Sequence, residues 1–195
     1  MELDKTLKMT IITLKILGID GFSPVVSEST QWTGWHTNFK PFTCEYCAKM
    51  HGNVFHKNNP PYPMPGEVHP NCNCTLIVLL CIEAGTATIN GLSGADYYIK
   101  HYGCLPGNYL SKNDALSIGW RSYKGNLRDV TLNGTIGGNI YANRDGQLPE
   151  AAGRVWYEAD INYTGGYRNA HRILYSNDGL IFVTYNHYET FYEVR

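Results

Sequence analysis

The clearest hydrophobic pattern lies in the second half of the chain. Between Val155 and Tyr163 the odd-numbered residues are apolar or aromatic, whereas Glu158, Asp160 and Asn162 occupy even positions. This period of two predicts an antiparallel strand with one face in the core and the other facing a polar cleft. Further strands are expected over Arg172–Tyr175, Leu180–Tyr185 and Thr190–Val194.

Helical patterns precede these strands. Asp96–Tyr102 has the pattern of a short helix, and Ser111–Asp114 matches a capping box that opens a second helix, which ends near Gly119. Helices followed by antiparallel strands predict an α+β domain over residues 94–195.

The first 93 residues divide into three segments of different composition. Residues 1–40 show no pattern that assigns a fold; their apolar run Leu7–Ile19 contains two lysines and is too short to span a bilayer. Residues 41–82 are rich in Cys, His and Pro, and they end in the strand-like run Thr75–Ile82. Residues 83–93 are small and polar, so we expect a linker there.

Composition narrows the classes of function. Of 195 residues, 43% are hydrophobic and 17% are charged, which is typical of a globular protein and not of a disordered one. The formal net charge is -1, and basic and acidic residues are equally frequent after residue 104. A nucleic acid would therefore have to bind through locally placed cations and not through a general positive field. No apolar run approaches the length of a membrane span, so we expect none.

The cysteines all precede residue 105, and four of them form two close pairs. Cys44 and Cys47 make a C-x2-C pair, which His69, Cys72 and Cys74 follow after a spacer. Two groups of soft ligands at this spacing predict a zinc-knuckle-like module with a tetrahedral structural zinc site. We expect Cys44, Cys47, His69 and Cys72 as the ligands, with Cys74 able to replace either of the last two. Two disulfides, or reduced cysteines without metal, are the alternatives.

The stretch Cys44–Leu79 also resembles the C-terminal region of phage minor head (head-morphogenesis) proteins. Its shared features are the C-x-x-C pair, a turn centred on Gly52, the Pro-rich loop Asn59–Pro65 and the H-P-x-C-x-C ending at Cys74. The resemblance covers only this stretch. It implies a phage-derived module of the kind that precedes a C-terminal toxin, with a capsid or carrier protein as a partner.

The C-terminal half offers few groups that could carry out chemistry. It holds no Cys and two histidines, His171 and His187, of which His171 is expected at the surface. Glu158 and His187, flanked by Arg168 and Arg172, suit phosphodiester transesterification. One group would remove a proton from a 2′-hydroxyl, the other would protonate the leaving oxygen, and the cations would offset phosphate charge. Taken alone, acids on a strand are more often partners in surface ion pairs, so the pattern leaves both readings open.

Leu105–Arg195 resembles the barnase-like, guanyl-preferring microbial ribonucleases along its whole length. The matching segments, in order, are LPGNYLSKNDALSIGW, KGNLRDV, IGGNIYANRDGQLP, GRVWYEADINYTGGYRN, RILYSNDGLI and HYETF. The resemblance implies the barnase-like ribonuclease fold. It also implies metal-independent cleavage of single-stranded RNA after guanine, through a 2′,3′-cyclic phosphate.

Carried over residue by residue, the resemblance implies two sets of site residues. The catalytic set is Glu158 as general base, His187 as general acid, and the phosphate-binding cations Lys112, Arg168 and Arg172. The substrate-binding set is the guanine-reading loop with Tyr141, Asn143, Arg144 and Asp145, together with Tyr188, which would stack on the base.

Further positions follow from the same resemblance. Asp160 would hold the two arginines, and Arg154 would form a structural salt bridge with Asp178. Two positions depart from the family. Asp145 stands where the family has Glu, which puts strict guanine preference in doubt. Asn139 replaces an acid beside Glu158, which should lower the pKa of that base.

Three functions compete at this stage. The first is a ribonuclease toxin that is secreted or delivered to target cells, acts in their cytoplasm and needs no cofactor for catalysis. Such an enzyme would require an acidic, barstar-like inhibitor covering its cationic cleft in the producing cell. The second is a degenerate module that binds RNA or a capsid partner. A deoxyribonuclease is disfavoured, because no paired metal carboxylates accompany Glu158.

Overall fold

The computed structural model describes residues 22–40 and 43–195, so Leu7–Ile19 lies outside the described residues. The elements are, in chain order, β1 (Val26–Thr37), α1 (Glu45–Met50), β2 (Val54–His56), β3 (Cys74–Ile82), η1 (Gly91–Ser93), α2 (Ala95–Tyr102), β4 (Tyr109–Leu110), α3 (Lys112–Ser117), η2 (Ser122–Lys124), α4 (Leu127–Val130), β5 (Thr135–Tyr141), β6 (Trp156–Asp160), β7 (Arg172–Ser176), β8 (Ile181–Thr184) and β9 (Tyr192–Val194). The α+β prediction is confirmed. Within the described part of the chain, no helix is both long and apolar enough to cross a membrane.

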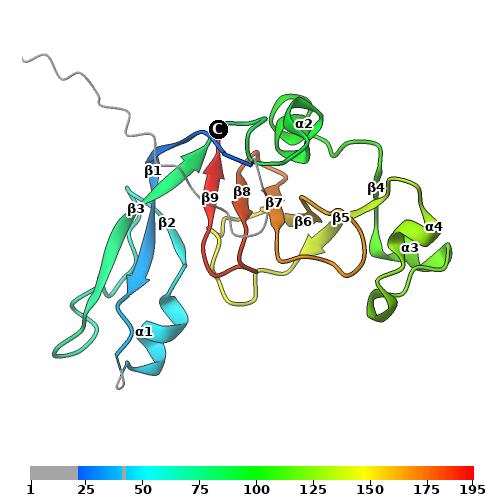
Figure 1. Ribbon diagram of the computed structural model, residues 1–195. Helices are drawn as coiled ribbons and strands as arrows, with labels where there is room; N and C mark the ends of the chain where they lie inside the picture. The colour runs from blue at the N-terminus through cyan, green and yellow to red at the C-terminus, as the bar shows by residue number, and fades with distance from the viewer. Residues whose placement is uncertain (1–21, 41–42) are drawn as a thin grey trace, which may run out of the picture.

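Strands β1, β2 and β3 form an antiparallel arm that, together with α1, we call the N-terminal module (residues 26–82; Figure 1). Strand β1 lies within the segment whose fold the sequence did not reveal. Its register against β3 is irregular between Glu28 and Thr33. A strand with such an irregularity loses the strict alternation that reveals strands in sequences.

One continuous sheet joins the N-terminal module to the remainder of the chain. The strand order is β2-β1-β3-β9-β8-β7-β6-β5-β4. The junction is a parallel pairing of β3 with β9, in which Cys81 faces Glu193 and Ile82 faces Val194. The two strands lie side by side in Figure 1.

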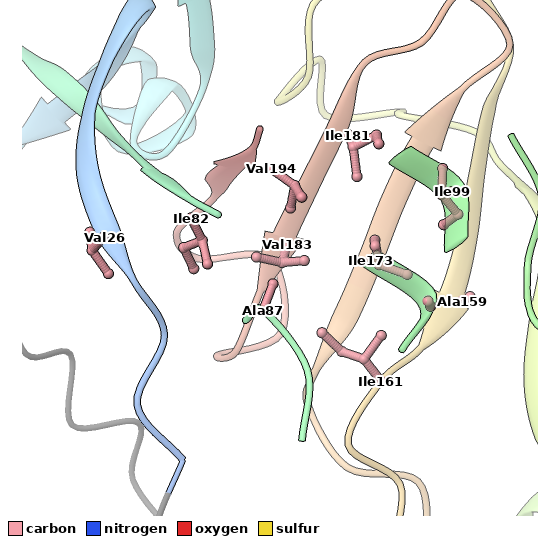
Figure 2. Packing of buried hydrophobic residues seen from close by; sticks show 11 residues of the cluster. Val26, Ile82, Ala87, Ile99, Ala159, Ile161, Ile173, Ile181, Val183 and Val194 are labelled. Atoms are coloured by element: carbon pink, nitrogen blue, oxygen red, sulfur yellow. The ribbon is translucent and has the colours of Figure 1, made fainter. Parts of the chain in front are cut away.

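Buried side chains also cross this junction. In one cluster, Val26 and Ile82 of the N-terminal module pack with Val183 and Val194 of the last strands (Figure 2). Ile99 of helix α2, which is 8% exposed, also packs in this cluster. The core is therefore shared between the module and the C-terminal half.

Residues 83–93, expected as a linker, form an ordered loop that is tied to α2. The buried Asp96 carboxylate accepts hydrogen bonds from the backbone N–H groups of Gly85 (2.7 Å) and Ala87 (2.9 Å) and from the Thr88 hydroxyl (2.8 Å). Three donors on one buried carboxylate fix the path of the loop, because a buried acceptor left without partners would be costly.

Both faces of β6 are largely buried, including the face that the sequence predicts to face a polar cleft. Ala159 is buried on the core side, as expected, but Trp156 and Asp160 on the other side are buried as well. Trp156 packs with Leu148 and Phe182 in a second hydrophobic cluster. The loop that follows β5 thus covers part of the face that the sequence assigned to the polar cleft.

Candidate active site

Glu158 lies at the centre of the candidate site, in the middle of β6 between Asn139 of β5 and Leu174 of β7. Its carboxylate oxygens have separate partners: Lys112 Nζ lies 2.6 Å from Oε1, and the Tyr188 hydroxyl donates to Oε2 at 2.8 Å. Glu158 is only 8% exposed. A nearly buried carboxylate with two donors is well fixed in position.

These contacts decide the protonation of Glu158. Burial raises the pKa of this carboxyl group. The hydrogen bonds from Lys112 and Tyr188, and the positive charges of Lys112 and Arg168, lower it by more, so the pKa lies below its ordinary value. The group is therefore ionised at neutral pH, as a general base must be.

Lys112 reaches Glu158 because the start of α3 docks on β5. Ser111 caps the helix by accepting a hydrogen bond from the Asp114 amide at 3.1 Å. The Lys112 amide donates to Oδ1 of Asn139 at 3.0 Å, beside an irregularity in β5 at Gly138. Gly138 has φ 78°, a conformation that favours glycine. The expected helix cap is confirmed.

Asp160 gathers two arginines, as expected. Arg168 donates to both carboxylate oxygens at 2.7 Å each. Arg172 Nε lies 3.0 Å from Oδ1, close enough for charge attraction but without hydrogen-bond geometry. The Arg172 Nη1 group instead donates to the backbone carbonyls of Asn169 (2.7 Å) and His171 (2.8 Å).

The cations differ in how far a ligand could reach them. The side chains of Lys112 and Arg168 are 39% and 25% exposed, whereas that of Arg172 is 5% exposed. Lys112 and Arg168 can therefore meet a phosphate directly, while Arg172 in this conformation mainly supports the loop around residue 169.

His187 and Tyr188 lie in the loop between β8 and β9, both with left-handed backbone conformations (φ 56° and 71°). His187 is exposed, and its ring centroid lies 4.9 Å from that of Tyr188. Because Tyr188 also donates to Glu158, this one ring contacts both the expected base and the expected acid.

The end of β5 and the loop after it carry four of the five residues expected to bind the base. Tyr141 stacks on Tyr188 with ring centroids 5.5 Å apart and planes 17° apart. The Asn143 side chain is buried and shapes the loop: it donates to the Leu148 carbonyl (2.8 Å) and accepts from the Leu148 amide (3.0 Å). Arg144 and Asp145 are exposed. The stacked tyrosines thus border a loop whose tip offers one cation and one carboxylate.

Comparisons with known proteins give the family. The family model described as ribonuclease matches residues 93–195. This chain belongs to the ribonuclease family, of the barnase/binase type. A ribonuclease of Bacillus intermedius is 49% identical over 124 residues, which are 63% of this chain and 76% of the relative. A ribonuclease of Heyndrickxia coagulans is 49% identical over 109 residues, which are 56% of this chain and all of the relative.

Two further expectations for the ribonuclease domain have opposite outcomes. The salt bridge of Arg154 with Asp178 is confirmed, with Nη2 at 2.8 Å from the carboxylate. The surface position expected for His171 is wrong. This residue is 8% exposed, and its Nδ1 lies 3.2 Å from the Asn162 amide nitrogen, because the β6–β7 connection folds over it.

Gln147, which lies beside the expected base-binding residues, was not identified from the sequence. The Gln147 side-chain amide donates to the Tyr188 carbonyl at 2.9 Å, and the Gln147 backbone carbonyl accepts from the Val54 amide at 2.7 Å. No motif marks such a residue, because both contacts join segments that are distant in the chain. The sequence also assigned Tyr188 only to base stacking, not to its bond with Glu158.

The Cys/His residues converge in the N-terminal module, far along the chain from the ribonuclease site. All six cysteines are unpaired thiols. Cys44, Cys47 and His69 form one group of potential metal ligands, and Cys47, Cys72 and Cys74 form another. Cys47 Sγ lies 3.5 Å from His69 Nε2 and 3.7 Å from Cys72 Sγ. Ligands 2.0–2.3 Å from a tetrahedral metal are separated by roughly 3.3–3.8 Å, so the distances from Cys47 to His69 and to Cys72 are compatible with a shared metal ion.

Proposed function

We propose that the chain is an endoribonuclease that cleaves single-stranded RNA with Glu158 as general base and His187 as general acid. The observation that carries the proposal is the pairing of an ionised, nearly buried Glu158 with Lys112 and with Tyr188, whose neighbour is the exposed His187. Membership of the ribonuclease family supports the same activity.

The reaction follows from the chemistry of these groups. Glu158 takes the proton of a ribose 2′-hydroxyl, whose oxygen attacks the adjacent phosphorus. The bond from phosphorus to the 5′-oxygen breaks as His187 donates a proton to that oxygen. Lys112 and Arg168, supported by Arg172, offset the negative charge on the phosphate oxygens. The products are a 2′,3′-cyclic phosphate and a free 5′-hydroxyl, and no metal is needed in these steps.

The proposal includes a preference for cleavage after guanine. The stacked Tyr141 and Tyr188 could hold a base face, and the loop through Asn143 presents backbone groups to its edge. Asp145 is one methylene shorter than the carboxylate that the family resemblance would place there, so we expect a weaker preference than a glutamate would give.

Purified protein incubated with EDTA tests the activity. Single-stranded RNA should be cut to products with 2′,3′-cyclic phosphate ends. DNA, and RNA with 2′-O-methyl groups, should remain intact because they lack the attacking hydroxyl. Cleavage of DNA, or cleavage of RNA only with added magnesium, would contradict the mechanism. RNA binding without cleavage would favour the degenerate RNA- or capsid-binding module.

We also propose that Cys44, Cys47, His69 and Cys72 hold a structural zinc ion, with Cys74 as the substitute ligand. The His69 Nδ1 atom lies 2.9 Å from the Pro70 carbonyl, which turns Nε2 towards the thiols. The metal would stabilise the N-terminal module and would take no part in catalysis.

The proposed partners follow from the exposed cations and from the Cys/His stretch. An acidic inhibitor of the barstar type would cover Lys112, Arg144 and Arg168, and its association rate should fall as salt rises. Arg144→Ala should weaken that complex. The phage-head-like stretch supports a toxin that is secreted or delivered with a phage-related carrier. Co-expression with the neighbouring reading frames, with and without an inhibitor candidate, tests toxicity.

A further inference from the structure

The loop that carries His187 and Tyr188 has an unfavourable backbone conformation. Both residues have positive φ, which costs non-glycine residues energy and persists only where surrounding contacts hold it. On the nuclease side, the His187 amide donates to the Ala170 carbonyl (3.1 Å) and the Tyr188 amide donates to Thr184 Oγ1 (3.0 Å). The carbonyl side of the loop is held by different contacts.

Gln147 holds the Tyr188 carbonyl and connects it to the N-terminal module. Its side-chain amide donates to that carbonyl at 2.9 Å, while its own backbone carbonyl accepts from the amide of Val54, the first residue of β2, at 2.7 Å. Val54 is 2% exposed. A buried residue of the module is thus two hydrogen bonds away from the loop that carries the general acid.

The turn between α1 and β2 lies close to the Glu189 carbonyl, which is the next carbonyl of the same loop. A Cβ atom on Gly52 would lie 2.6 Å from the Glu189 carbonyl oxygen and 3.8 Å from Gln147 Nε2. Gly52 also has φ +83°. The module therefore approaches the loop so closely that only glycine fits there.

Packing behind these contacts is shared as well. Trp32 and Val54 of the module lie in one hydrophobic cluster with Leu148 and Phe182, and Tyr188 packs against that cluster. Rigid packing of this kind transmits a displacement of the module to the loop, because close-packed interiors yield little.

We propose that Gln147 and the Gly52 turn are positioning elements for the general acid, so that the N-terminal module is a working part of the ribonuclease site. The inference rests on the proposed ribonuclease function. Removing the Gln147 hydrogen bond, or adding a Cβ atom at Gly52, should displace His187 from the leaving oxygen. Glu158 should stay fixed by Lys112.

Gln147→Met tests the inference, because methionine keeps the length of the side chain and removes the donor. On a guanine-containing dinucleotide, kcat/KM should fall on the order of tenfold, since misplacing a catalytic group is costly. On guanosine 3′-(4-nitrophenyl phosphate), whose leaving group needs no proton, the loss should be less than about threefold, because the acid step no longer contributes and only the smaller effect of Tyr188 on Glu158 and on base stacking remains. Gln31→Met, at an exposed position of β1, is the matched control and should behave as the wild type on both substrates.

Gly52→Ala tests the same inference from the other side. Its control is Gly153→Ala, which has a similar φ of +78° but open space around the added Cβ. Both changes place alanine at a positive φ and carry that energetic cost. Only Gly52→Ala should lower kcat/KM on the dinucleotide, and this loss should be small on the nitrophenyl ester. Far-ultraviolet circular dichroism and the Tm of each variant report whether folding is intact.

The outcomes separate the inference from the ribonuclease function. If the wild type cleaves neither substrate, both are overturned. If the wild type cleaves RNA and the folded Gln147→Met and Gly52→Ala variants match it, the positioning role alone is overturned. An equal loss on both substrates also overturns it, because a general structural defect would not spare the activated leaving group.

Discussion

The phenol of Tyr188 donates a 2.8 Å hydrogen bond to Glu158 Oε2, while its ring lies 4.9 Å from the ring of His187. One side chain thus connects the proposed base with the proposed acid. The hydrogen bond stabilises the ionised carboxylate and contributes to the lowered pKa of Glu158. Tyr188 therefore tunes the base besides stacking on Tyr141.

Tyr188→Phe should move the acid limb of the pH profile. Removing a donor to the carboxylate disfavours its charged form, so the pKa of Glu158 should rise. Activity is lost as the pH falls through this pKa, so the lower limb of kcat/KM should shift to higher pH. Tyr175→Phe, outside the site, is the control. An unchanged lower limb would mean that the hydrogen bond is not made in solution.

Glu158→Gln and His187→Ala should each lower the rate of RNA cleavage by about 10²–10⁴-fold, the usual contribution of a general base or acid. The two variants should differ with the nitrophenyl ester, on which His187→Ala recovers and Glu158→Gln does not. If Glu158 were only an ion-pair partner, Glu158→Gln would change the Tm and leave turnover nearly intact.

Asp160→Asn should destabilise the fold far more than Asp178→Asn. Asp160 is 1% exposed and lies beside the buried Arg172, so removing its charge leaves a buried cation uncompensated at a cost of about 3–5 kcal/mol. The pair of Asp178 with Arg154 is more exposed, and its loss should cost less than about 1 kcal/mol. Urea unfolding of both variants measures the difference; similar midpoints would contradict it.

Buried His171 should make stability depend on pH. Burial, followed by the nearby charge of Arg172, lowers the pKa of His171 in the folded state. The unfolded chain then binds the proton more readily than the folded chain. The contribution of His171 to the free energy of unfolding is therefore fully present above about pH 6.5 and is lost as the pH drops from there towards the lower folded pKa. His171→Gln should flatten this fall. The free energy of unfolding measured between pH 7 and pH 5 tests it, and an unaltered slope in the variant would exclude His171 as the source.

The proposed zinc site predicts about one zinc per chain, since a structural site holds a single tetrahedral ion. Cys47→Ser should abolish zinc binding, because Cys47 belongs to both groups of potential ligands. Cys104→Ser should not, because Cys104 is exposed and outside those groups. Elemental mass spectrometry gives the metal content. Disulfides among these cysteines in the metal-free native protein would contradict the proposal.

Local patterns revealed several elements of the C-terminal half, but not β4, α4 or β5. The helix expected over Asp96–Tyr102 corresponds to α2, and the cap at Ser111 corresponds to the start of α3. Strands β7 and β8 lie within one or two residues of their expected ranges. These features depend on periodicity and caps, which neighbouring residues largely determine.

What the sequence did not reveal depends on contacts between distant residues. Ile82 pairs with Val194, but nothing in the sequence of either segment indicates that the two strands are neighbours. Likewise, His171 looks like a surface histidine until the β6–β7 connection covers it, and Gln147 gains its role only through Val54 and Tyr188. Tertiary structure, not local pattern, determines such positions.

The pairing of β3 with β9 also affects how copies of the chain meet. Exposed strand edges offer unpaired peptide groups to other molecules and promote intermolecular pairing. Strand β9 would form such an edge beside the ribonuclease sheet if β3 did not cover it. Within the described part of the chain, the sheet ends instead on β2 and β4, which are 3 and 2 residues long. Copies of the chain that pair edge to edge would therefore meet at β2 or β4 and not at β9, which is itself only 3 residues long.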